Sequence, residues 1–475
     1  MQKPVGKTVW NMTMQSWNPD IRAAKGPKYL AIAQALSDDI EAGILAAGDR
    51  LPPQRTLAEA LGLDLTTVTR AYGEAQRLGL IEGSGRRGSF VRARPTVSPS
   101  VPAGDPGDTG MNAPPDGFGG TLMTAFRDCA TALLSPESAT LPFQYQRSGG
   151  APSARKAGAE LLGARGIPCS EDTVLVAAGG QNALHAIFSA EFRAGDMLAV
   201  CPQVYPGLLA LARRFGVTLL SISSDADGMD PDALARACAE GAVRGVYLVP
   251  TNDNPTTVTM PVERREAMAK VVVKHNLLLI EDDAYGWLPD HPLPPITSRA
   301  PANSWYIASV SKVLTPGLRV AWLRAPDVAG AWRLAADMHE TAIMAPPLNA
   351  AVVTEWVHAG VFQKLVAEVR SEARVRQGMA RECLAPASFR SQEYGYHLWI
   401  EVPDDLDTRH ICDALRQYGL PAVPGDAFAA DRSAAGPAAM RVSIGGTIAR
   451  DQLRRGLNLL SALISPQAPR KVSLV

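Results

Sequence analysis

The sequence predicts an α/β protein in three parts: a small helical head that ends in a β-hairpin, a linker, and a large body. In the body we expect a mostly parallel sheet and, from about residue 340, a smaller C-terminal α+β subdomain. Three observations lead to this fold class. Helical apolar spacing followed by a glycine-flanked hairpin pattern marks a head domain within residues 1–94. Residues 95–118 are rich in Pro, Gly, Ser and Asp and lack apolar periodicity. In the body, residues 119–475, short apolar runs then alternate with amphipathic segments as far as about residue 340.

Composition narrows the class of protein. The chain has 475 residues, with 47 Lys/Arg balanced by 47 Asp/Glu, but residues 1–94 carry 13 basic against 9 acidic side chains. A modestly basic head is compatible with nucleic-acid binding. The sequence shows neither a signal-peptide pattern nor an apolar run of about eighteen residues, so we expect a cytoplasmic protein with no membrane segment. Its six cysteines and seven histidines are scattered, so we expect reduced thiols and no metal site.

The head begins with three predicted helices. Helical spacing identifies the first by its buried side, which comprises Tyr29, Ile32, Ala33, Leu36 and Ile40. Pro53 is typical of the start of the second helix, and Gly62 of its end. Asp64 or Thr66 is positioned to cap the third helix. The buried stripe of that third helix is expected to be Val68, Ala71, Tyr72, Ala75 and Leu78.

The third helix turns short polar side chains outward, and a hairpin follows it. Hydroxyls and an arginine near the start of a helix suit base edges in the major groove, and the outward set is Thr66, Thr67, Thr69, Arg70 and Glu74. In "LIEGSGRRGSFV" the expected hairpin tip holds Arg86 and Arg87, which suit phosphates or the minor groove. A helical interaction module with solvated charges is the alternative.

The motifs "LPPQRTLAEALGL", "TTVTRAYGEA" and "GLIEGSGRRGSFV" resemble the GntR-type winged helix-turn-helix. The resemblance implies a double-stranded DNA operator as partner. It also implies a DNA-contacting set of Arg55, Thr66, Thr67, Arg70, Arg86 and Arg87.

In the body, six apolar runs read as buried strands, most of them followed by a polar or glycine-bearing loop and an amphipathic segment. They are residues 174–176, 198–200, 246–249, 277–280, 305–307 and 320–323. This alternation is typical of a largely parallel sheet covered on both faces. Beyond residue 340 a long helix, an alternating strand over 397–402 and a closing helix over 448–464 predict the α+β subdomain.

Lys312 in "SVSKVLTPGLR" raises the possibility of an amine that holds an aldehyde cofactor such as pyridoxal 5'-phosphate. That cofactor also requires a carboxylate for its ring nitrogen, which Asp282 at the end of a strand could supply. Tyr285 and Asn254 are candidate donors to its phenolic oxygen. Asp283 alternates to the other face of the strand, where we expect a solvated or capping carboxylate.

The phosphate and the ring have candidates too. The turn "AAGGQNALHAI" offers Gly179, Gly180 and Gln181 at a helix start, where amides bind phosphate. Tyr205 lies in a strand-end loop suited to stacking. The further polar groups expected around Lys312 and the phosphate are Ser309, Ser311 and Arg319. Each signal alone is weak, but their order along the chain, each at a strand end, is specific.

The body resembles fold-type I aminotransferases of the aspartate aminotransferase class. The motifs that carry the resemblance are "GGQNAL", "YPG", "NPTT", "EDDAYG", "SVSKVLTPGLR", "GYHLWIEVP" and "MRVSIGG". It implies pyridoxal phosphate on Lys312, a grip by Arg441 on a substrate carboxylate, and a homodimer in which Tyr145 reaches the neighbouring subunit's phosphate. Thr257 departs from the glycine that many members have at that place.

Head, linker and body together resemble the MocR type of transcription regulator, which implies a head-to-tail homodimer. In that family the body is a cofactor-dependent sensor, so the resemblance implies that an amino acid or amine effector displaces Lys312 by transaldimination and repositions the heads. The cofactor itself is an alternative effector. A working aminotransferase with a regulatory or vestigial head is the second possibility, because Lys312, Asp282 and Arg441 are all present. A body that merely kept the fold is the third.

Overall fold

The structure, a computed structural model, describes residues 17–21, 26–83, 88–92, 110–116, 120–135, 144–385, 389–431 and 438–465. The chain divides into two units, Met1–Gly104 and Asp105–Val475, which are considered separately below. No helix within the described ranges is both long and apolar enough to span a bilayer.

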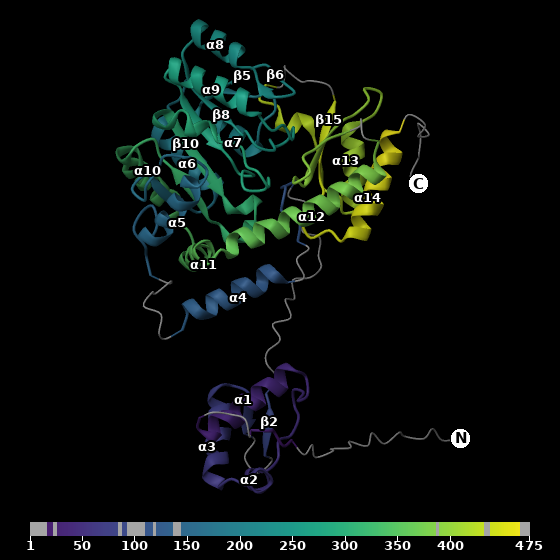
Figure 1. Cartoon of the computed structure of the whole chain (residues 1–475). Helices are drawn as coiled ribbons and strands as arrows, with labels where there is room; N and C mark the ends of the chain where they lie inside the picture. The colour runs from purple at the N-terminus through teal and green to yellow at the C-terminus, as the bar shows by residue number, and fades with distance from the viewer. Residues whose placement is uncertain are drawn as a thin grey trace, which may run out of the picture. The chain divides into compact units, whose positions relative to one another are not determined.

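The head is the predicted three-helix module with a two-stranded wing (Figure 1). Its elements are α1 (Lys28–Glu41), α2 (Gln54–Leu61), α3 (Leu65–Arg77), β1 (Ile81–Gly83) and β2 (Ser89–Val91). The strands pair antiparallel, with Ile81 opposite Val91. The wing tip, residues 84–87, lies outside the described residues. The winged helix-turn-helix prediction is confirmed.

Local signals in the sequence set the helix ends of the head. Gly62 ends α2 with φ +65°, a left-handed conformation that glycine adopts without steric penalty. Asp64 caps α3, because its carboxylate accepts a hydrogen bond from the Thr67 amide. The predicted buried stripe holds except for Leu78, which is 52% exposed. Leu78 follows the last helical residue, Arg77, so it no longer continues the apolar face of α3.

A seven-stranded sheet forms the centre of the body, in the order β3-β11-β10-β9-β8-β4-β5. Its strands are β3 (Val174–Ala177), β4 (Met197–Val200), β5 (Thr218–Ser221), β8 (Val243–Leu248), β9 (Leu278–Asp282), β10 (Ser304–Ser309) and β11 (Ala321–Arg324). Every neighbouring pair is parallel except those that involve β11. The largely parallel sheet is therefore confirmed, with β5 as a strand that the apolar runs did not reveal.

Helices cover both faces of this sheet (Figure 1). Leu184, Leu208 and Leu334 pack in the core of one face, and Leu234 and Met268 pack in that of the other. The helices of the large part of the body are α4 (Thr121–Leu133), α5 (Pro152–Gly163), α6 (Gly180–Glu191), α7 (Pro206–Phe215), α8 (Pro231–Glu240), α9 (Val262–Lys274), α10 (Val328–Ala342) and α11 (Pro347–His358).

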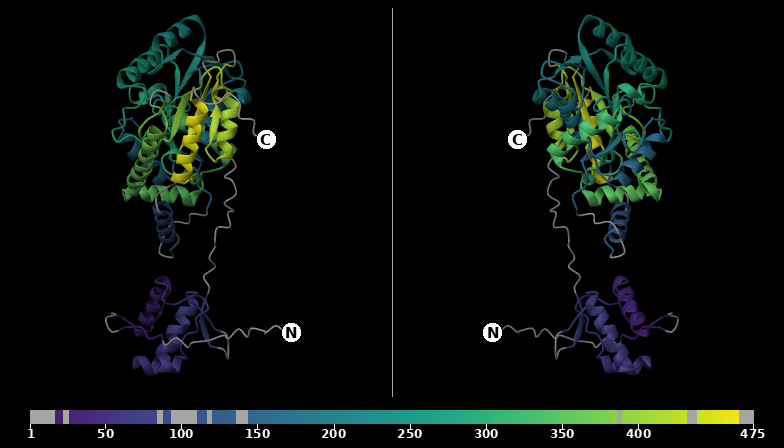
Figure 2. Two further views of the ribbon diagram at one scale, coloured as in Figure 1. Left: turned by 90° about the vertical axis from the view of Figure 1, so that its right-hand side faces the viewer. Right: turned by 90° about the vertical axis from the view of Figure 1, so that its left-hand side faces the viewer.

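The C-terminal subdomain is built on an antiparallel sheet ordered β12-β13-β15-β14. Its strands are β12 (Phe389–Arg390), β13 (His397–Glu401), β14 (Ala422–Pro424) and β15 (Ala439–Ser443). Its helices are α12 (Val361–Cys383), α13 (Thr408–Gln417) and α14 (Arg450–Ile464). Figure 2 shows α13 and α14 side by side on this sheet. The long α12 contacts α11 at one end of the body and α14 at the other (Figure 1).

Residues 110–116, within the segment expected to be linker, are packed into the body. The Gly446 amide donates to the carbonyls of Ala113 (3.0 Å) and Pro114 (3.1 Å), and the Asp116 amide donates back to the Gly446 carbonyl (2.9 Å). Apolar periodicity did not predict this packing, because main-chain groups rather than side chains form the hydrogen bonds. The short stretch joins the C-terminal subdomain beside β15.

Candidate functional site

A cavity of about 270 Å³ opens at the carboxyl ends of the parallel strands. Open α/β sheets bind ligands at this edge. Ten of the residues singled out from the sequence line it: Gly180, Gln181, Tyr205, Asn254, Asp282, Tyr285, Ser309, Ser311, Lys312 and Arg319. The structure therefore brings together groups that are spread over about 140 residues of sequence, from Gly180 to Arg319.

Lys312 closes a single 3-10 turn, Val310–Lys312, directly after β10. The Tyr396 hydroxyl donates to the Lys312 carbonyl at 2.7 Å, which fixes the backbone at that point. Lys312 Nζ donates to the Asn112 carbonyl at 2.5 Å. Burial lowers the pKa of the amine to about 8, helped by the positive charge of Arg441 and opposed by Asp282. A larger fraction of the amine is thus neutral, and nucleophilic, near neutral pH than for an ordinary lysine.

Asp282 ends β9 and is buried at the base of the cavity. Burial raises its pKa to about 6, while a hydrogen bond from the Tyr247 hydroxyl to Oδ2, at 2.9 Å, lowers it. Tyr247 also lines the cavity, and the sequence pattern indicated it only as part of an apolar strand. The signal that could have identified Tyr247 as a site residue was its hydroxyl group, one residue before the end of a parallel strand.

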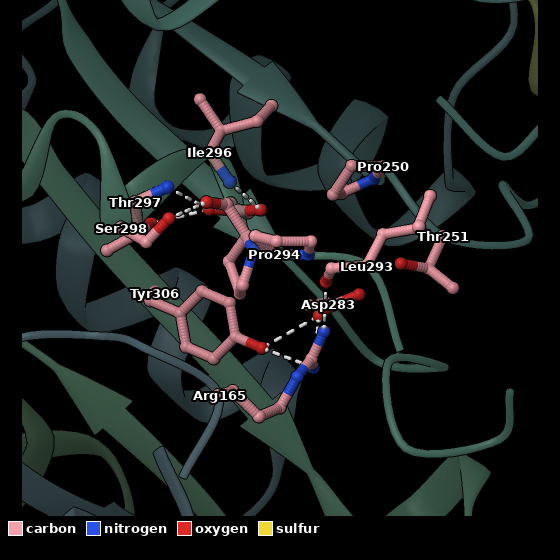
Figure 3. A network of polar contacts seen from close by, with 12 residues as sticks. Arg165, Pro250, Thr251, Asp283, Leu293, Pro294, Ile296, Thr297, Ser298 and Tyr306 are labelled. Atoms are coloured by element: carbon pink, nitrogen blue, oxygen red, sulfur yellow. Dashed lines mark hydrogen bonds and ion pairs between the residues drawn. The ribbon is translucent and has the colours of Figure 1, made fainter. Parts of the chain in front are cut away.

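Asp283 is not the solvated or capping carboxylate that we expected. It is 1% exposed and lies on the opposite side of the strand, where Figure 3 shows it facing Arg165 and Tyr306. Arg165 Nη1 lies 2.6 Å from Oδ2, and the Tyr306 hydroxyl donates to the same oxygen at 2.7 Å. Burial alone would raise the pKa of Asp283, but the positive charges of Arg165 and Arg265 together with nearby hydroxyl donors outweigh burial, so the pKa is lowered. Asp283 is therefore a structural ion-pair residue beside the cavity.

Two neighbouring hydrogen bonds orient the donors at the cavity. Asn254 Oδ1 accepts from Arg441 Nη1 at 2.9 Å, which assigns its Nδ2 as the donor left for another group. The Tyr285 hydroxyl oxygen accepts from Asn112 Nδ2 at 3.1 Å, which leaves the phenolic hydrogen available for donation. Both residues thus present N–H or O–H groups suited to a ligand oxygen.

The other end of the cavity has the features of an anion site. Gly180 begins α6, and Gly179 before it has φ +92°; a Cβ there would lie 2.7 Å from Arg319 Nη2. Arg319 Nη2 donates to the Ala178 carbonyl at 2.8 Å, which holds the guanidinium beside this turn. The Ser311 hydroxyl is buried with no hydrogen-bond partner among the described residues. The helix start, the cation and the unused hydroxyl fit a phosphate.

Tyr205 and Tyr145 occupy different settings. Tyr205 precedes α7, and its ring lies against Gly207, where an added Cβ would be 2.3 Å from the ring. The Tyr205 ring lines the cavity, but Tyr145 does not, and Tyr145 is 81% exposed. The stacking role of Tyr205 and the intersubunit role of Tyr145 stay predictions.

Arg441 lies on β15, beside the cavity rather than among the residues that line it. It is 2% exposed. Its Nη1 donates to Asn254, and its Nη2 donates to the main-chain carbonyl of Gly110. The guanidinium also lies over the Phe428 ring, with Cζ 5.1 Å from the ring centroid. A buried arginine so held is suited to bind a carboxylate.

The predicted DNA-contacting residues that the structure describes lie on α2 and α3. Arg55, Thr66 and Arg70 are exposed, and Arg70 lies over the Tyr29 ring, 4.4 Å from Cζ to the centroid. The hydroxyls of Thr66 and Thr67 both donate to Asp64, which lowers the pKa of that carboxyl to about 2. Thr67 is therefore used in part to cap the helix. Arg86 and Arg87 lie outside the described residues.

Sequence reasoning missed Asn112 and His397 as well as Tyr247. Asn112 Nδ2 lies 3.0 Å from His397 Nδ1, and both residues are buried. Asn112 also hydrogen-bonds Lys312 and Tyr285. Asn112 falls in a segment whose composition indicated linker, so only its position before the first helix of the body could have drawn attention. In the described part of the chain, no three His, Cys, Asp or Glu side chains are placed to hold a metal ion.

Comparison with known proteins places both parts of the chain. Residues 122–460 match the family model described as aminotransferase class I and II, and residues 28–91 match bacterial regulatory proteins of the gntR family. The uncharacterized HTH-type transcriptional regulator YdeF of Bacillus subtilis is 30% identical over 454 residues, which cover 94% of this chain and 97% of that protein. The vitamin B6 salvage pathway transcriptional repressor PtsJ of Salmonella typhimurium is 26% identical over 396 residues, which cover 83% of each chain.

A solved structure gives the fold of the body. The α-aminoadipate aminotransferase LysN from Thermus thermophilus, complexed with N-(5'-phosphopyridoxyl)-L-leucine, superimposes with a TM-score of 0.66 at 25% identity, covering 75% of this chain and 90% of that one. Fold and matches together define the class of protein: a transcription regulator with a GntR-type DNA-binding head and an aminotransferase-like domain. The chain belongs to the MocR-type transcriptional regulators, and its body to aminotransferase class I and II.

Proposed function

We propose that this regulator binds pyridoxal 5'-phosphate at Lys312 and senses an amino acid or amine that takes the place of Lys312 on the cofactor aldehyde. The observation that carries the proposal is one cavity in which an amine of lowered pKa faces a buried carboxylate, Asp282, and an anion-binding turn at Gly180. These three groups match the aldehyde, ring nitrogen and phosphate of the cofactor.

When bound, the cofactor supplies an aldehyde that condenses reversibly with amines. The chain supplies everything else. Asp282 would hold a proton on the ring nitrogen, while Asn254 Nδ2 and the Tyr285 hydroxyl would donate to the phenolic oxygen. Arg319, Ser311 and the amides at the start of α6 would hold the phosphate. The unpartnered Ser311 hydroxyl supports this assignment, because a buried hydroxyl without a partner is costly unless a ligand uses it.

Arg441 would select effectors that carry a carboxylate. A guanidinium binds a carboxylate through two parallel N–H groups, and that geometry fixes the direction of the attached amine. Arg441 hydrogen-bonds Asn254, which lines the cavity together with Lys312, so a carboxylate bound at Arg441 brings its amine toward the Lys312 end. Binding that differs between two states of the body then shifts the regulator between them.

In the proposed assembly the chain forms a head-to-tail homodimer on a double-stranded DNA operator. The exposure of Tyr145 supports a partner subunit at that surface, because a tyrosine that serves a neighbour's phosphate must lie outside its own cavity. In the head, Arg55, Thr66, Thr67 and Arg70 would contact the operator from α2 and α3, and Arg86 and Arg87 from the wing.

Reductive trapping tests the cofactor assignment. Borohydride reduction of the purified, cofactor-loaded protein followed by peptide mapping should place one pyridoxyl adduct on the peptide that contains Lys312. Lys312→Ala should lose the adduct while keeping the far-UV circular dichroism of the wild type. An adduct on Lys270 or Lys274, at the surface helix α9, would contradict the assignment.

Titration tests the sensing role. The absorbance of the bound cofactor should change when amino acids or amines from a panel are added, and the operator footprint should change with it. Arg441→Ala should retain the cofactor but lose about 2–5 kcal/mol of affinity for carboxylate-bearing effectors, as expected for removal of one partner of a buried charge pair. If the Arg441→Ala protein still responds to its effector as the wild type does, the effector is a simple amine or the cofactor itself.

Catalytic turnover is a second candidate function, favoured by the lowered pKa of Lys312 (about 8), which suits a general base near neutral pH. A full transamination cycle between an amino-acid donor and a 2-oxo acid, measured in the absence of DNA, would show it. A half-reaction that consumes one equivalent of amino acid and then stops would favour the sensor.

A further inference from the structure

The segment Gly110–Asp116, hereafter the latch segment, lies against the same charged groups that an effector would use. Its Gly110 carbonyl accepts from Arg441 Nη2, and its Asn112 carbonyl accepts from Lys312 Nζ at 2.5 Å. Met111, between them, lines the cavity. The first described residues after the head therefore occupy hydrogen-bonding sites on the two cations of the proposed effector site.

A bound carboxylate competes directly with the Gly110 carbonyl. One arm of the Arg441 guanidinium, Nη1, already donates to Asn254, and the other, Nη2, donates to Gly110. A carboxylate bound across Nη1 and Nη2 uses the nitrogen that now donates to Gly110, and it competes with that carbonyl for the guanidinium. The exchange favours the carboxylate, because a hydrogen bond to an ionised acceptor is about twice as strong as one to a neutral carbonyl.

The bond from Lys312 to Asn112 depends on whether Lys312 is a free amine. An ammonium group donates three hydrogens, and the Asn112 carbonyl takes one of them. Capture of an aldehyde by Lys312, or its replacement there by an amino compound, changes the number and direction of the hydrogens on Nζ. The Asn112 main chain is thus a direct neighbour of the reacting nitrogen.

The Asn112 side chain connects the latch segment to both parts of the body. His397 Nε2 lies 3.0 Å from the Asp253 carbonyl, which can only accept, so Nε2 carries the ring hydrogen. His397 Nδ1 must then accept from Asn112 Nδ2, which also donates to the Tyr285 hydroxyl. Burial lowers the pKa of His397 to about 3, so this arrangement persists at neutral pH.

We propose that the latch segment is the element that the effector displaces: the Gly110 carbonyl is a resident ligand of Arg441, and its release moves the end of the linker. The proposal rests on the function proposed above and adds the step between the site and the head. Because the chain runs from the head into Gly110, a carboxylate on Arg441 changes where the tether to the DNA-binding domain leaves the body.

A first test needs no effector. The amides of Asp116 and Gly446 hydrogen-bond between the latch segment and the body, and hydrogen exchange of the full-length protein reports them. Asn112→Ala should accelerate exchange at both amides by fivefold or more, whereas Asn458→Ala, on the exposed side of α14, should not. If Asn112→Ala fails to fold, Arg441→Lys is the alternative variant. A lysine lacks the planar fork that bonds Asn254 and Gly110 together, so exchange at both amides should again accelerate. Unchanged exchange in a folded variant of either kind would overturn the latch.

A second test separates the latch from the proposed function. L-Alanine, ethylamine and propanoate are added in turn to the full-length protein loaded with pyridoxal phosphate, and cofactor absorbance is recorded beside exchange at Asp116 and Gly446. L-Alanine should change both signals, and propanoate should accelerate exchange alone. Ethylamine should change absorbance, with a smaller effect on exchange because it leaves Arg441 bonded to Gly110.

The outcomes are distinguishable. An absorbance change with L-alanine but unaltered exchange would refute the latch and leave the sensor standing. No absorbance change with either amine would count against the sensor, and the latch is then judged by the first test and by propanoate. If the latch competes with the effector, Asn112→Ala should also tighten L-alanine binding, by a factor within the range of about 5–150 typical of coupled sites.

Discussion

At the residue scale, burial in the cavity brings the pKa values of two titratable groups, Lys312 and Asp282, closer together. Burial lowers the pKa of Lys312 to about 8 and raises that of Asp282 to about 6, so both lie far closer to neutrality than free side chains. Arg441 adds to the shift of Lys312, while Tyr247 limits that of Asp282. Environment rather than residue type therefore determines how these groups handle protons.

The rate at which the apo-protein captures pyridoxal phosphate should rise about tenfold per pH unit up to about pH 8 and then level off, because only the neutral Lys312 amine attacks. Stopped-flow absorbance measures the rate, and the reaction of a free lysine analogue corrects for ionisation of the cofactor. Arg441→Gln should move the break to higher pH. A rate that still rises beyond pH 10, as for an ordinary lysine, would contradict the lowered pKa.

The same shift affects stability. Since the folded pKa of Lys312 lies below its unfolded value, the unfolded chain binds more protons between about pH 8 and pH 10.4. The free energy of unfolding of the apo-protein should therefore gain a positive contribution with pH across that window. Lys312→Met should remove this contribution, which urea titrations at pH 7 and pH 10 would reveal.

Tyr247→Phe should weaken pyridoxal phosphate binding by about tenfold, equivalent to the roughly 1.5 kcal/mol of a hydrogen bond to a charged group. Without the Tyr247 hydroxyl, the pKa of Asp282 rises further and the carboxylate holds the ring-nitrogen proton less well. Equilibrium dialysis measures the affinity. Tyr306→Phe is the matched control, since it removes a hydroxyl from Asp283 on the other side of the strand and should leave the affinity unchanged.

At the element scale, some residues were predictable and others were not. Asp282 and Lys312 were predictable because each lies at the carboxyl end of a buried strand, Asp282 as the last residue of β9 and Lys312 in the turn after β10, and parallel strands bring these ends to one edge. Asn112 was not, because its side-chain partners lie 173 and 285 residues away and its own segment has a linker composition. Short edge strands such as β12 and β14 lack enough residues to show an alternating pattern.

The role proposed for the wing rests on the charges of Arg86 and Arg87. Replacing Arg86 and Arg87 together by alanine should weaken binding to all DNA and make the slope of log K against log salt shallower by about 2, one for each phosphate that is no longer neutralised. Fluorescence anisotropy on operator and random duplexes measures both. Thr66→Ala should instead reduce the ratio between the two affinities. An unchanged salt slope in the double variant would refute phosphate contact by the wing.

At the scale of the whole molecule, the proposed dimer predicts complementation between subunits. A mixed dimer of a Tyr145→Ala chain and a Lys312→Ala chain should bind one pyridoxal phosphate with wild-type affinity, because the chain that keeps Lys312 receives Tyr145 from its partner. The Tyr145→Ala homodimer should bind more weakly, by about tenfold for a hydrogen bond to a charged phosphate. Tagged co-expression isolates the mixed dimer. If it binds no more tightly than the Tyr145→Ala homodimer, Tyr145 acts within its own chain or not at all.

The helix α12 has a mechanical consequence for the body. It is a single helix of 23 residues that packs on α11 at one end and on α14 at the other. At 1.5 Å per residue its length is about 35 Å, so a tilt of 5° about one end carries the other end by about 3 Å. A rotation too small to alter the packing around α11 therefore becomes a displacement as large as a hydrogen bond is long. Such a rotation of α12 would carry with it the C-terminal subdomain, in which α12 packs against α14.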